Sequence, residues 1–407
     1  MIMRKLLFLI FIFTIPVANA QLSRLYDNGV ALFKQGDYKG TKIIMTRVIN
    51  KSEYYFEAYT YRAMAYEQLG MPDSAKADFE KALEIKPGYL PAIFYRGVMY
   101  FNLKDYDKAI ADFTTVLSKR PKYVKAILYR GRAYEATGRR DDAIADYSSA
   151  IKMNLKSYEI YYRRGLLFEK KNMPKDAIWD YDDAIALNDR FAPAYFHRGK
   201  MYQIREKDSL ALTDFNKVTE LTDTIKEVYE LRGDLNFKLG NYNAAAEDYS
   251  VIINKYRVRD GNLYYKRAEA YYLDSNYSQA YKEYSRVLKV KPRYDKAVVG
   301  QAKVYMARGK PASALPLLRK ALAFNPNNGE AYYLRGLIFF EQKKYEEAKA
   351  DFDQSIKHEP RPAAYFYRGS CKYESGDKYG ACLDLQQAIK TGYKENDVEE
   401  AVKRVCR

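Results

Sequence analysis

Residues 195–215 read YFHRGKMYQIREKDSLALTDF, and this stretch carries the spacing that decides the fold. A glycine at position 199 is followed by an alanine at 211 and a phenylalanine at 215. The small residue recurs about every 34 residues along the chain, as Gly29, Ala63, Gly97, Gly131, Gly165, Gly199, Gly233, Ala268, Ala302, Gly336 and Gly369. A repeat of this length predicts an array of similar small units rather than a few compact globules.

Two further columns keep the register of the small residue. An alanine follows it in every unit but the first, in the column Thr41, Ala75, Ala109, Ala143, Ala177, Ala211, Ala245, Ala280, Ala314, Ala348 and Ala381. A bulky residue comes next, in the column Met45, Phe79, Phe113, Tyr147, Tyr181, Phe215, Tyr249, Tyr284, Leu318, Phe352 and Leu385. Small side chains let helices approach closely, and bulky ones fill the space beside them. The columns therefore predict a pair of packed helices in every unit.

The quoted stretch resembles the tetratricopeptide repeat (TPR), which pairs a small residue in a first helix with an alanine and an aromatic residue in a second. The resemblance covers about residues 22–393, or eleven units. It implies an all-α fold, a right-handed superhelical solenoid of about eleven helix-turn-helix units over residues 21–393. It also implies that the first helices line a concave groove, where partner segments usually bind.

The end of the chain is too short for another unit. Residues 394–407 place four apolar side chains on one helical face, which predicts a capping helix for the last repeat. Of the three cysteines, Cys371 occupies a column that is otherwise mostly apolar, which indicates a buried apolar substitute. Cys382 and Cys406 are then candidates for a disulfide that attaches the cap. Other pairings, or three free thiols, remain open. The apolar face consists of Val398, Ala401, Val402 and Val405.

Residues 1–20 have the pattern of a secretory signal peptide, with a basic start, an apolar run over Leu6–Val17 and a small-residue cleavage site. We expect cleavage between Ala20 and Gln21. The apolar run is too short to span a bilayer, and no later run is longer, so we expect no integral membrane span after cleavage. The expected location is the periplasm or outer cell envelope of a bacterium, or the medium as a secreted protein.

Composition excludes several classes of function. With 48% hydrophobic and 30% charged residues, the 407-residue chain is too apolar to be disordered. The net charge of +17 is spread along the chain with acids between the bases, so we expect no nucleic-acid partner. Two histidines and three late cysteines provide few metal ligands, and we expect no metal and no cofactor. No phosphate-binding loop, HExxH, nucleophile elbow or CxxC motif is present, which predicts a protein that is not an enzyme.

An arginine precedes the small residue in nine units, and each has an acid sixteen residues downstream. The two units without the arginine also lack the acid, which predicts an ion pair inside each repeat that fixes helix packing. A basic stripe for anionic ligands is the less favoured interpretation. The predicted pairs are Arg62 with Asp78, Arg96 with Asp112, Arg130 with Asp146, Arg164 with Asp180, Arg198 with Asp214, Arg232 with Asp248, Arg267 with Glu283, Arg335 with Asp351 and Arg368 with Asp384.

Aromatic residues share one face of the predicted first helices near both ends of the array. They predict a groove that is apolar at its ends, whereas Arg132 and Lys200 make its middle charged. The alternative is that these aromatic residues pack against neighbouring helices. The predicted aromatic partner-binding residues are Tyr26, Phe33, Phe94, Phe101, Tyr333 and Phe340.

Together these features predict a non-enzymatic scaffold that binds partner protein segments in its groove and supports a secretion or envelope-assembly complex. The alternative is a protein that binds an anionic envelope polymer, peptidoglycan or lipopolysaccharide, through its basic surface. The ninth unit is expected to be the least regular, because Pro316 falls inside its second helix and Gly300 weakens its first.

Overall fold

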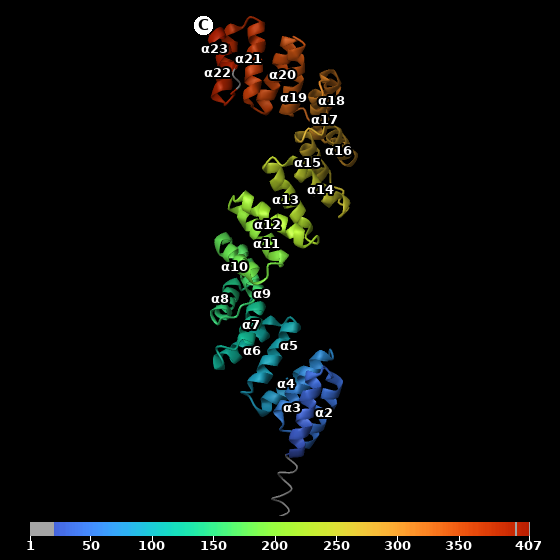
Figure 1. The fold of residues 1–407 in the computed structure, drawn as a ribbon, viewed down its shortest axis with the longest axis vertical. Coiled ribbons are helices and arrows are strands. Elements are labelled where there is room, and N and C mark those ends of the chain that lie inside the picture. The colour runs from blue at the N-terminus through green and yellow to red at the C-terminus, as the bar shows by residue number, and fades with distance from the viewer. Residues whose placement is uncertain (1–19, 395–396, 407) are drawn as a thin grey trace, which may run out of the picture. The chain divides into compact units, whose positions relative to one another are not determined.

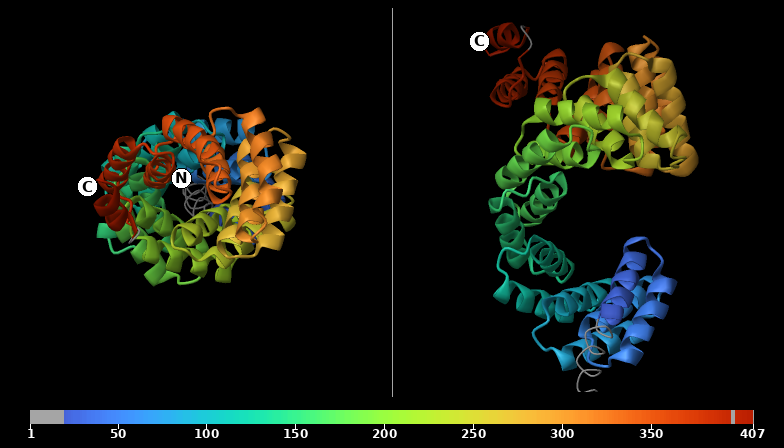
Figure 2. Two further views of the ribbon diagram at one scale, coloured as in Figure 1. Left: turned by 90° about the horizontal axis from the view of Figure 1, so that it is seen from above. Right: turned by 60° about the horizontal axis from the view of Figure 1, so that its bottom comes forward.

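The computed structural model describes residues 20–394 and 397–406, and every regular element in this part of the chain is a helix (Figure 1). The helices form two compact units, one ending at Glu206 and the other beginning at Lys207. Within each unit every helix packs beside the next one along the chain (Figures 1 and 2). Each unit is therefore a stack of antiparallel helix pairs. The signal peptide predicted over residues 1–20 lies, except for Ala20, outside the described residues.

The first unit contains the following helices. They are residues 20–34, α2 (Tyr38–Lys51), α3 (Phe56–Gln68), α4 (Pro72–Ile85), α5 (Leu90–Asn102), α6 (Tyr106–Lys119), α7 (Val124–Ala136), α8 (Arg140–Lys152), α9 (Tyr158–Lys170), α10 (Pro174–Leu187) and α11 (Ala192–Ile204).

The second unit continues the alternation. Its helices are α12 (Asp208–Leu221), α13 (Lys226–Lys238), α14 (Tyr242–Asn254), α15 (Gly261–Leu273), α16 (Tyr277–Val290), α17 (Asp295–Ala307), α18 (Pro311–Phe324), α19 (Gly329–Glu341), α20 (Tyr345–His358), α21 (Pro362–Glu374), α22 (Lys378–Lys390) and α23 (Asp397–Val405).

Local chemistry sets the ends of these helices. Pro72 and Pro174 occupy the first helical position of α4 and α10, where a missing N–H costs no hydrogen bond. Gly138, between α7 and α8, has a φ of 75°, a left-handed conformation that glycine adopts without strain. The turn within each pair is therefore short and sharp, and the two helices fold back against each other.

The predicted columns form the core. Ala143 and Gly131 are buried, and Tyr147 of the bulky column is only 1% exposed. A Cβ atom placed on Gly131 would lie 2.9 Å from Cε1 of Tyr147, which is too close for an ordinary contact. The glycine thus lets the ring of the second helix pack directly against the backbone of the first.

The ninth repeat is as regular as its neighbours. α18 continues unbroken through Pro316, and α17 and α18 have the same lengths as other helix pairs. Gly300 is needed for packing, because a Cβ atom at this position would lie 2.4 Å from Cε1 of Tyr284 in the preceding repeat. The expected irregularity is therefore absent from this helix pair, and faster hydrogen exchange there stays a prediction.

The last helix, α23, is shorter than the predicted cap and packs on α22. Val398 and Val405 are buried, 3% and 5% exposed, beside Leu385 of the last repeat. A disulfide joins Cys382 in α22 to Cys406, with the two Cα atoms 5.1 Å apart, and the third cysteine, Cys371, is buried and free. The apolar end of the second unit is thus covered and covalently attached to its cover.

Candidate functional site

Where a predicted arginine and its acid lie in the same compact unit of the structure, the two side chains form an ion pair. For example, Arg96 Nε donates to Asp112 Oδ2 at 2.9 Å, and Arg96 Nη2 donates to Asp112 Oδ1 at 2.7 Å. Asp112 is only 6% exposed, and its hydrogen bonds raise the pKa of Arg96. The same pairing is found for Arg62–Asp78, Arg130–Asp146, Arg164–Asp180, Arg232–Asp248, Arg267–Glu283, Arg335–Asp351 and Arg368–Asp384.

We call these residues the arginine ladder. Arg198 lies in the first compact unit and Asp214 of the same repeat lies in the second, so their pairing stays a prediction. The ladder resembles a ligand trap in sequence, but its guanidinium groups are already bound to buried carboxylates. It therefore holds the two helices of a repeat together rather than offering charge to a ligand.

A third hydrogen bond of the ladder was missed by sequence reasoning. Arg164 Nη1 donates to Ser148 Oγ of the preceding repeat at 2.8 Å, and Arg130 Nη1 donates to Thr114 Oγ1 at 3.2 Å. The acceptor lies two residues after the acid of the preceding repeat. Where glutamine replaces the arginine, Gln301 Nε2 still donates to Ser285 Oγ at 2.9 Å. This polar column is the signal that could have revealed the contact between repeats.

Some repeats carry charge on their first helix, the helix that is predicted to line the groove. Tyr181 Oη donates to Glu169 Oε2 at 2.8 Å, and His197 Nδ1 of the next repeat lies 2.8 Å from the same oxygen. Lys200 Nζ lies 3.6 Å from Glu169 Oε1. Burial, followed by the negative charge of Glu169, raises the pKa of Tyr181. A core tyrosine, the carboxylate of Glu169, and the imidazole and ammonium groups of the following repeat therefore form one connected network.

The same network recurs in three other repeats. Tyr147 donates to Glu135, which lies 3.4 Å from Arg163. In the second unit Tyr249 donates to Asp234, which binds Lys266, and Tyr284 donates to Glu269, which lies 3.7 Å from Lys303. The cation Arg132, predicted to face a ligand, is also paired, with Glu159 at 2.8 Å. The predicted charged part of the groove is therefore internally neutralised.

Other repeats fill the same space with aromatic rings. Phe101 packs edge-on against Tyr129 of the next repeat at 5.6 Å, and Tyr129 lies 5.6 Å from Phe113. Phe33 packs on Tyr61 in the same manner, with ring centroids 5.7 Å apart. Both phenylalanines are half-buried, so each is part of the packing and part of the surface.

The second unit repeats this arrangement. Phe340 packs on Tyr367 at 5.3 Å, Tyr367 stacks on Phe352, and Tyr333 lies 6.1 Å from Phe352. The rings therefore pack on the next repeat, as the alternative interpretation expects, and partner binding by these residues stays a prediction.

Phe94 is the exception among the predicted groove residues. It is 3% exposed and lies 5.1 Å from Tyr123, which follows α6 and covers it. Phe94 also packs on Phe113 in the core. Its alanine variant would therefore test folding rather than binding, and the residues in front of it are the accessible ones.

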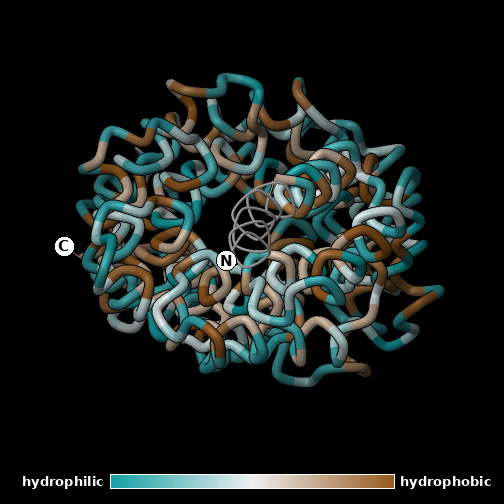
Figure 3. The backbone as a smooth tube through the Cα atoms, turned by 90° about the horizontal axis from the view of Figure 1, so that it is seen from below, coloured by the Kyte–Doolittle hydropathy of each residue, from teal (hydrophilic) through white to brown (hydrophobic). Residues whose placement is uncertain are grey.

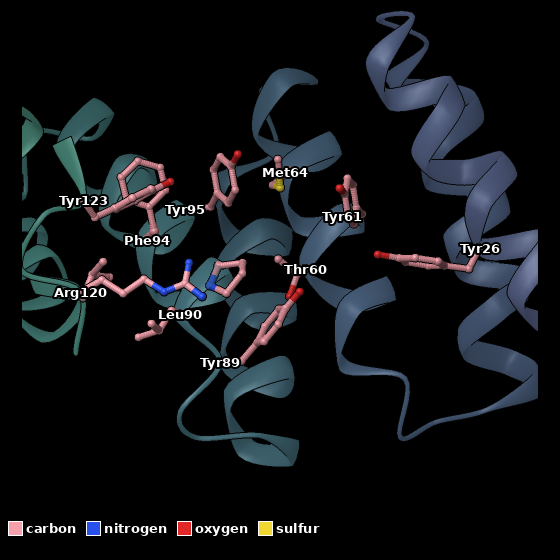
Figure 4. Close-up of a pocket in the computed structure, with 12 residues that line it drawn as sticks. Tyr26, Thr60, Tyr61, Met64, Tyr89, Leu90, Phe94, Tyr95, Arg120 and Tyr123 are labelled. Atoms are coloured by element: carbon pink, nitrogen blue, oxygen red, sulfur yellow. The ribbon is translucent and has the colours of Figure 1, made fainter. Parts of the chain in front are cut away.

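A pocket of about 290 Å³ opens in front of Phe94, between the first repeats of the first unit (Figure 4). Burial raises the pKa of Tyr95 and, together with the charge of Glu57, raises the pKa of Tyr89 to about 12. Arg120 is the one cation among the lining residues. We call this the tyrosine pocket, and its lining residues are Tyr26, Thr60, Tyr61, Met64, Tyr89, Leu90, Pro91, Phe94, Tyr95, Val116, Arg120 and Tyr123.

Apolar residues are interleaved with polar ones along the described helices (Figure 3). None of these helices combines the length and the apolar character needed to cross a bilayer. In the same part of the chain, no three histidine, cysteine or carboxylate side chains are grouped as metal ligands.

Comparison with known families matches three families, each described as tetratricopeptide repeat. One matches residues 128–195 and 299–348, another residues 56–89, and a third residues 100–151. These matches show tetratricopeptide repeats over the matched residues, and the helix pairs described above continue the same pattern. Proteins of this class are generally scaffolds for protein–protein interaction and are typically non-catalytic.

Individual relatives are distant. A segment is 25% identical over 96 residues to the Hsp70-Hsp90 organizing protein 3 of Arabidopsis thaliana, covering 24% of this chain and 17% of that protein. The crystal structure of YrrB, a TPR protein with an unusual peptide-binding site, is 20% identical with a TM-score of 0.41, covering 46% of this chain and 97% of that one. A TPR protein from Parabacteroides merdae is 19% identical with a TM-score of 0.37, covering 70% and 99% of the two chains.

Proposed function

We propose that this protein is a non-enzymatic scaffold that holds a segment of a partner protein in the tyrosine pocket. The observation that carries the proposal is the pocket itself. Its tyrosines are half-buried, and they surround an apolar floor of Met64, Leu90 and Phe94. Large aromatic side chains fixed by packing provide contact area at little entropic cost, which is typical of protein interfaces.

We further propose that the scaffold works outside the cytoplasm, in the cell envelope of a bacterium, within a secretion or envelope-assembly complex. The leader pattern of residues 1–20 supports export. The disulfide between Cys382 and Cys406 also supports it, because disulfides persist mainly in oxidising compartments. Intact mass of the protein from its native cells tests the proposal, since a chain that retains Met1 would contradict export through this leader.

Binding is tested with a double variant, Tyr61→Ala with Tyr95→Ala. The matched control is Tyr54→Ala, because Tyr54 is 72% exposed in the same unit and does not line the pocket. Cross-linking followed by purification from the native envelope identifies the partner, and titration of that partner gives affinities. We expect the double variant to lose about 2 kcal/mol of binding free energy or more. Unchanged affinity in a folded double variant would exclude the pocket.

The net charge of +17 favours the second candidate, an anionic envelope polymer such as peptidoglycan or lipopolysaccharide. Within the described residues the groove cations Arg132, Lys266 and Lys303 are already paired with carboxylates, so such a polymer would need another surface. Salt separates the two candidates, because polymer binding through charge weakens steeply with ionic strength whereas aromatic contacts persist.

A further inference from the structure

Arg120 distinguishes the tyrosine pocket from the rest of the groove. It is the cap residue immediately after α6, and its guanidinium group extends into the pocket between Leu90 and Tyr95 in the view of Figure 4. It is exposed, and within residues 20–394 and 397–406 it forms no ion pair. The cations of the charged repeats, such as Lys266, are bound to carboxylates instead.

The surroundings of Arg120 make a carboxylate its natural partner. Leu90, Pro91 and Phe94 line the same pocket, so the guanidinium group stands beside apolar surface, where an ion pair is screened less than in open solvent. Tyr89 and Tyr95 line the same pocket, and a tyrosine hydroxyl is a hydrogen-bond donor as well as an acceptor. A volume of about 290 Å³ accepts one or two side chains, not a folded domain.

The charge balance selects a single negative charge. Arg120 is the only cation that lines the pocket, and the charge of Glu57 adds to burial in raising the pKa of Tyr26 and Tyr89. A doubly charged phosphate would have one guanidinium group to neutralise it and a carboxylate nearby to repel it. One side-chain carboxylate avoids that mismatch.

We propose that the tyrosine pocket recognises a partner segment in which an aspartate or glutamate stands beside a bulky apolar residue. The carboxylate pairs with Arg120, and the apolar side chain lies against Tyr61, Met64 and Tyr95. This inference rests on the proposed function, because it names the chemistry of the segment that the scaffold binds.

The test is a selection of displayed random short peptides on the full-length protein and on two charge-reversal variants. Arg120→Glu reverses the charge inside the pocket. Lys122→Glu makes the same change two residues away, at an exposed position that does not line the pocket. We expect the wild-type protein and Lys122→Glu to select peptides with an acid next to a large apolar residue. Arg120→Glu is expected to select a base at that position.

A synthetic peptide from the wild-type selection then gives affinities. We expect Arg120→Gln to weaken its binding about tenfold, while Lys122→Gln leaves it unchanged. If the selected peptides carry no acid, or if the acid is retained on Arg120→Glu, the inference is wrong although groove binding stands. Preference for a phosphorylated version of the peptide over the acidic one would also overturn it. If the selected peptides bind the Tyr61→Ala, Tyr95→Ala variant equally well, the proposed function itself fails.

Discussion

Phe113 and Tyr147 occupy the same core position in consecutive repeats, yet the groove in front of them differs. On the groove side of Phe113, the space is filled by two aromatic rings. They belong to Phe101 of the same repeat and Tyr129 of the next repeat. On the groove side of Tyr147, the hydroxyl group that phenylalanine lacks donates a hydrogen bond to Glu135. Arg163 of the next repeat pairs with the same carboxylate.

The comparison shows that the chemistry of the groove is coupled to the core. A buried hydroxyl needs an acceptor, a half-buried carboxylate needs a cation, and each requirement is met one layer nearer the surface. A buried phenylalanine has no such requirement and lets aromatic residues of the next repeat stack on it. The aromatic and charged regions of the groove are therefore two solutions built on one backbone pattern.

The largest effect that we predict is the same in both regions. Asp112→Ala and Asp146→Ala each leave a ladder arginine without its buried partner, and we expect each to lower the free energy of unfolding by about 3 kcal/mol. Urea unfolding followed by circular dichroism measures it. Asp141→Ala, which removes a carboxylate that is 83% exposed, is the control and should change little. A much larger cost in one region would show that the ladder depends on the groove chemistry.

An intermediate effect follows from exchanging the two core rings. Phe113→Tyr places a hydroxyl group against Phe101, which cannot accept a hydrogen bond as the carboxylate of Glu135 does in the next repeat. We therefore expect a loss of about 2 kcal/mol in the free energy of unfolding. Tyr147→Phe removes a satisfied hydrogen bond and should cost about 1 kcal/mol. The same urea experiment measures both. Equal and negligible costs would mean that the hydroxyl does not distinguish the two regions.

The smallest effect is a pH dependence confined to the charged region. Burial alone would raise the pKa of Glu169, but the hydrogen bond and charge of His197, with Tyr181 and Lys200, outweigh it and lower the pKa. A carboxyl group with a lowered pKa in the folded state stabilises the protein above its unfolded pKa and loses that contribution as the pH falls through the folded value.

We therefore expect Glu169→Gln to remove part of the loss of stability that the wild-type protein shows below about pH 4.5, the usual value for a glutamate. Thermal unfolding at a series of pH values measures it. Glu67 in the aromatic region, whose pKa burial raises, provides the comparison, since Glu67→Gln should not have this effect. Parallel pH profiles for wild type and Glu169→Gln would contradict the prediction.

The repeat spacing was sufficient to predict the helix pairs and the acid that pairs with each ladder arginine. The joint loss of arginine and acid in two units was sufficient to pair Arg96 with Asp112, because both positions are fixed by helix geometry. The third bond, from Arg164 to Ser148, was missed because its acceptor column mixes hydroxyl, amide and carboxylate side chains.

Two residues that follow α6, Arg120 and Tyr123, were not used in the sequence analysis. Tyr123 belongs to a column just before the first helix of a repeat, which also contains Tyr55 and Tyr89. The position of Tyr123 explains why Phe94, which periodicity places on the groove face, is covered. Likewise Gly300 appears unfavourable in a helix until the ring of Tyr284 is found against it.

The ladder has a consequence for how such a chain lengthens. Arginine and acid stand sixteen residues apart inside one repeat, so a tandem duplication of a whole repeat brings a complete ion pair with it. The disulfide has the opposite effect, because Cys382 lies in the last repeat and Cys406 beyond α23. A copy of a different repeat inserted between α22 and α23 would separate the two cysteines, whereas a copy inserted anywhere upstream leaves them together. Only a duplicate of the last repeat brings a second equivalent of Cys382 to the cap.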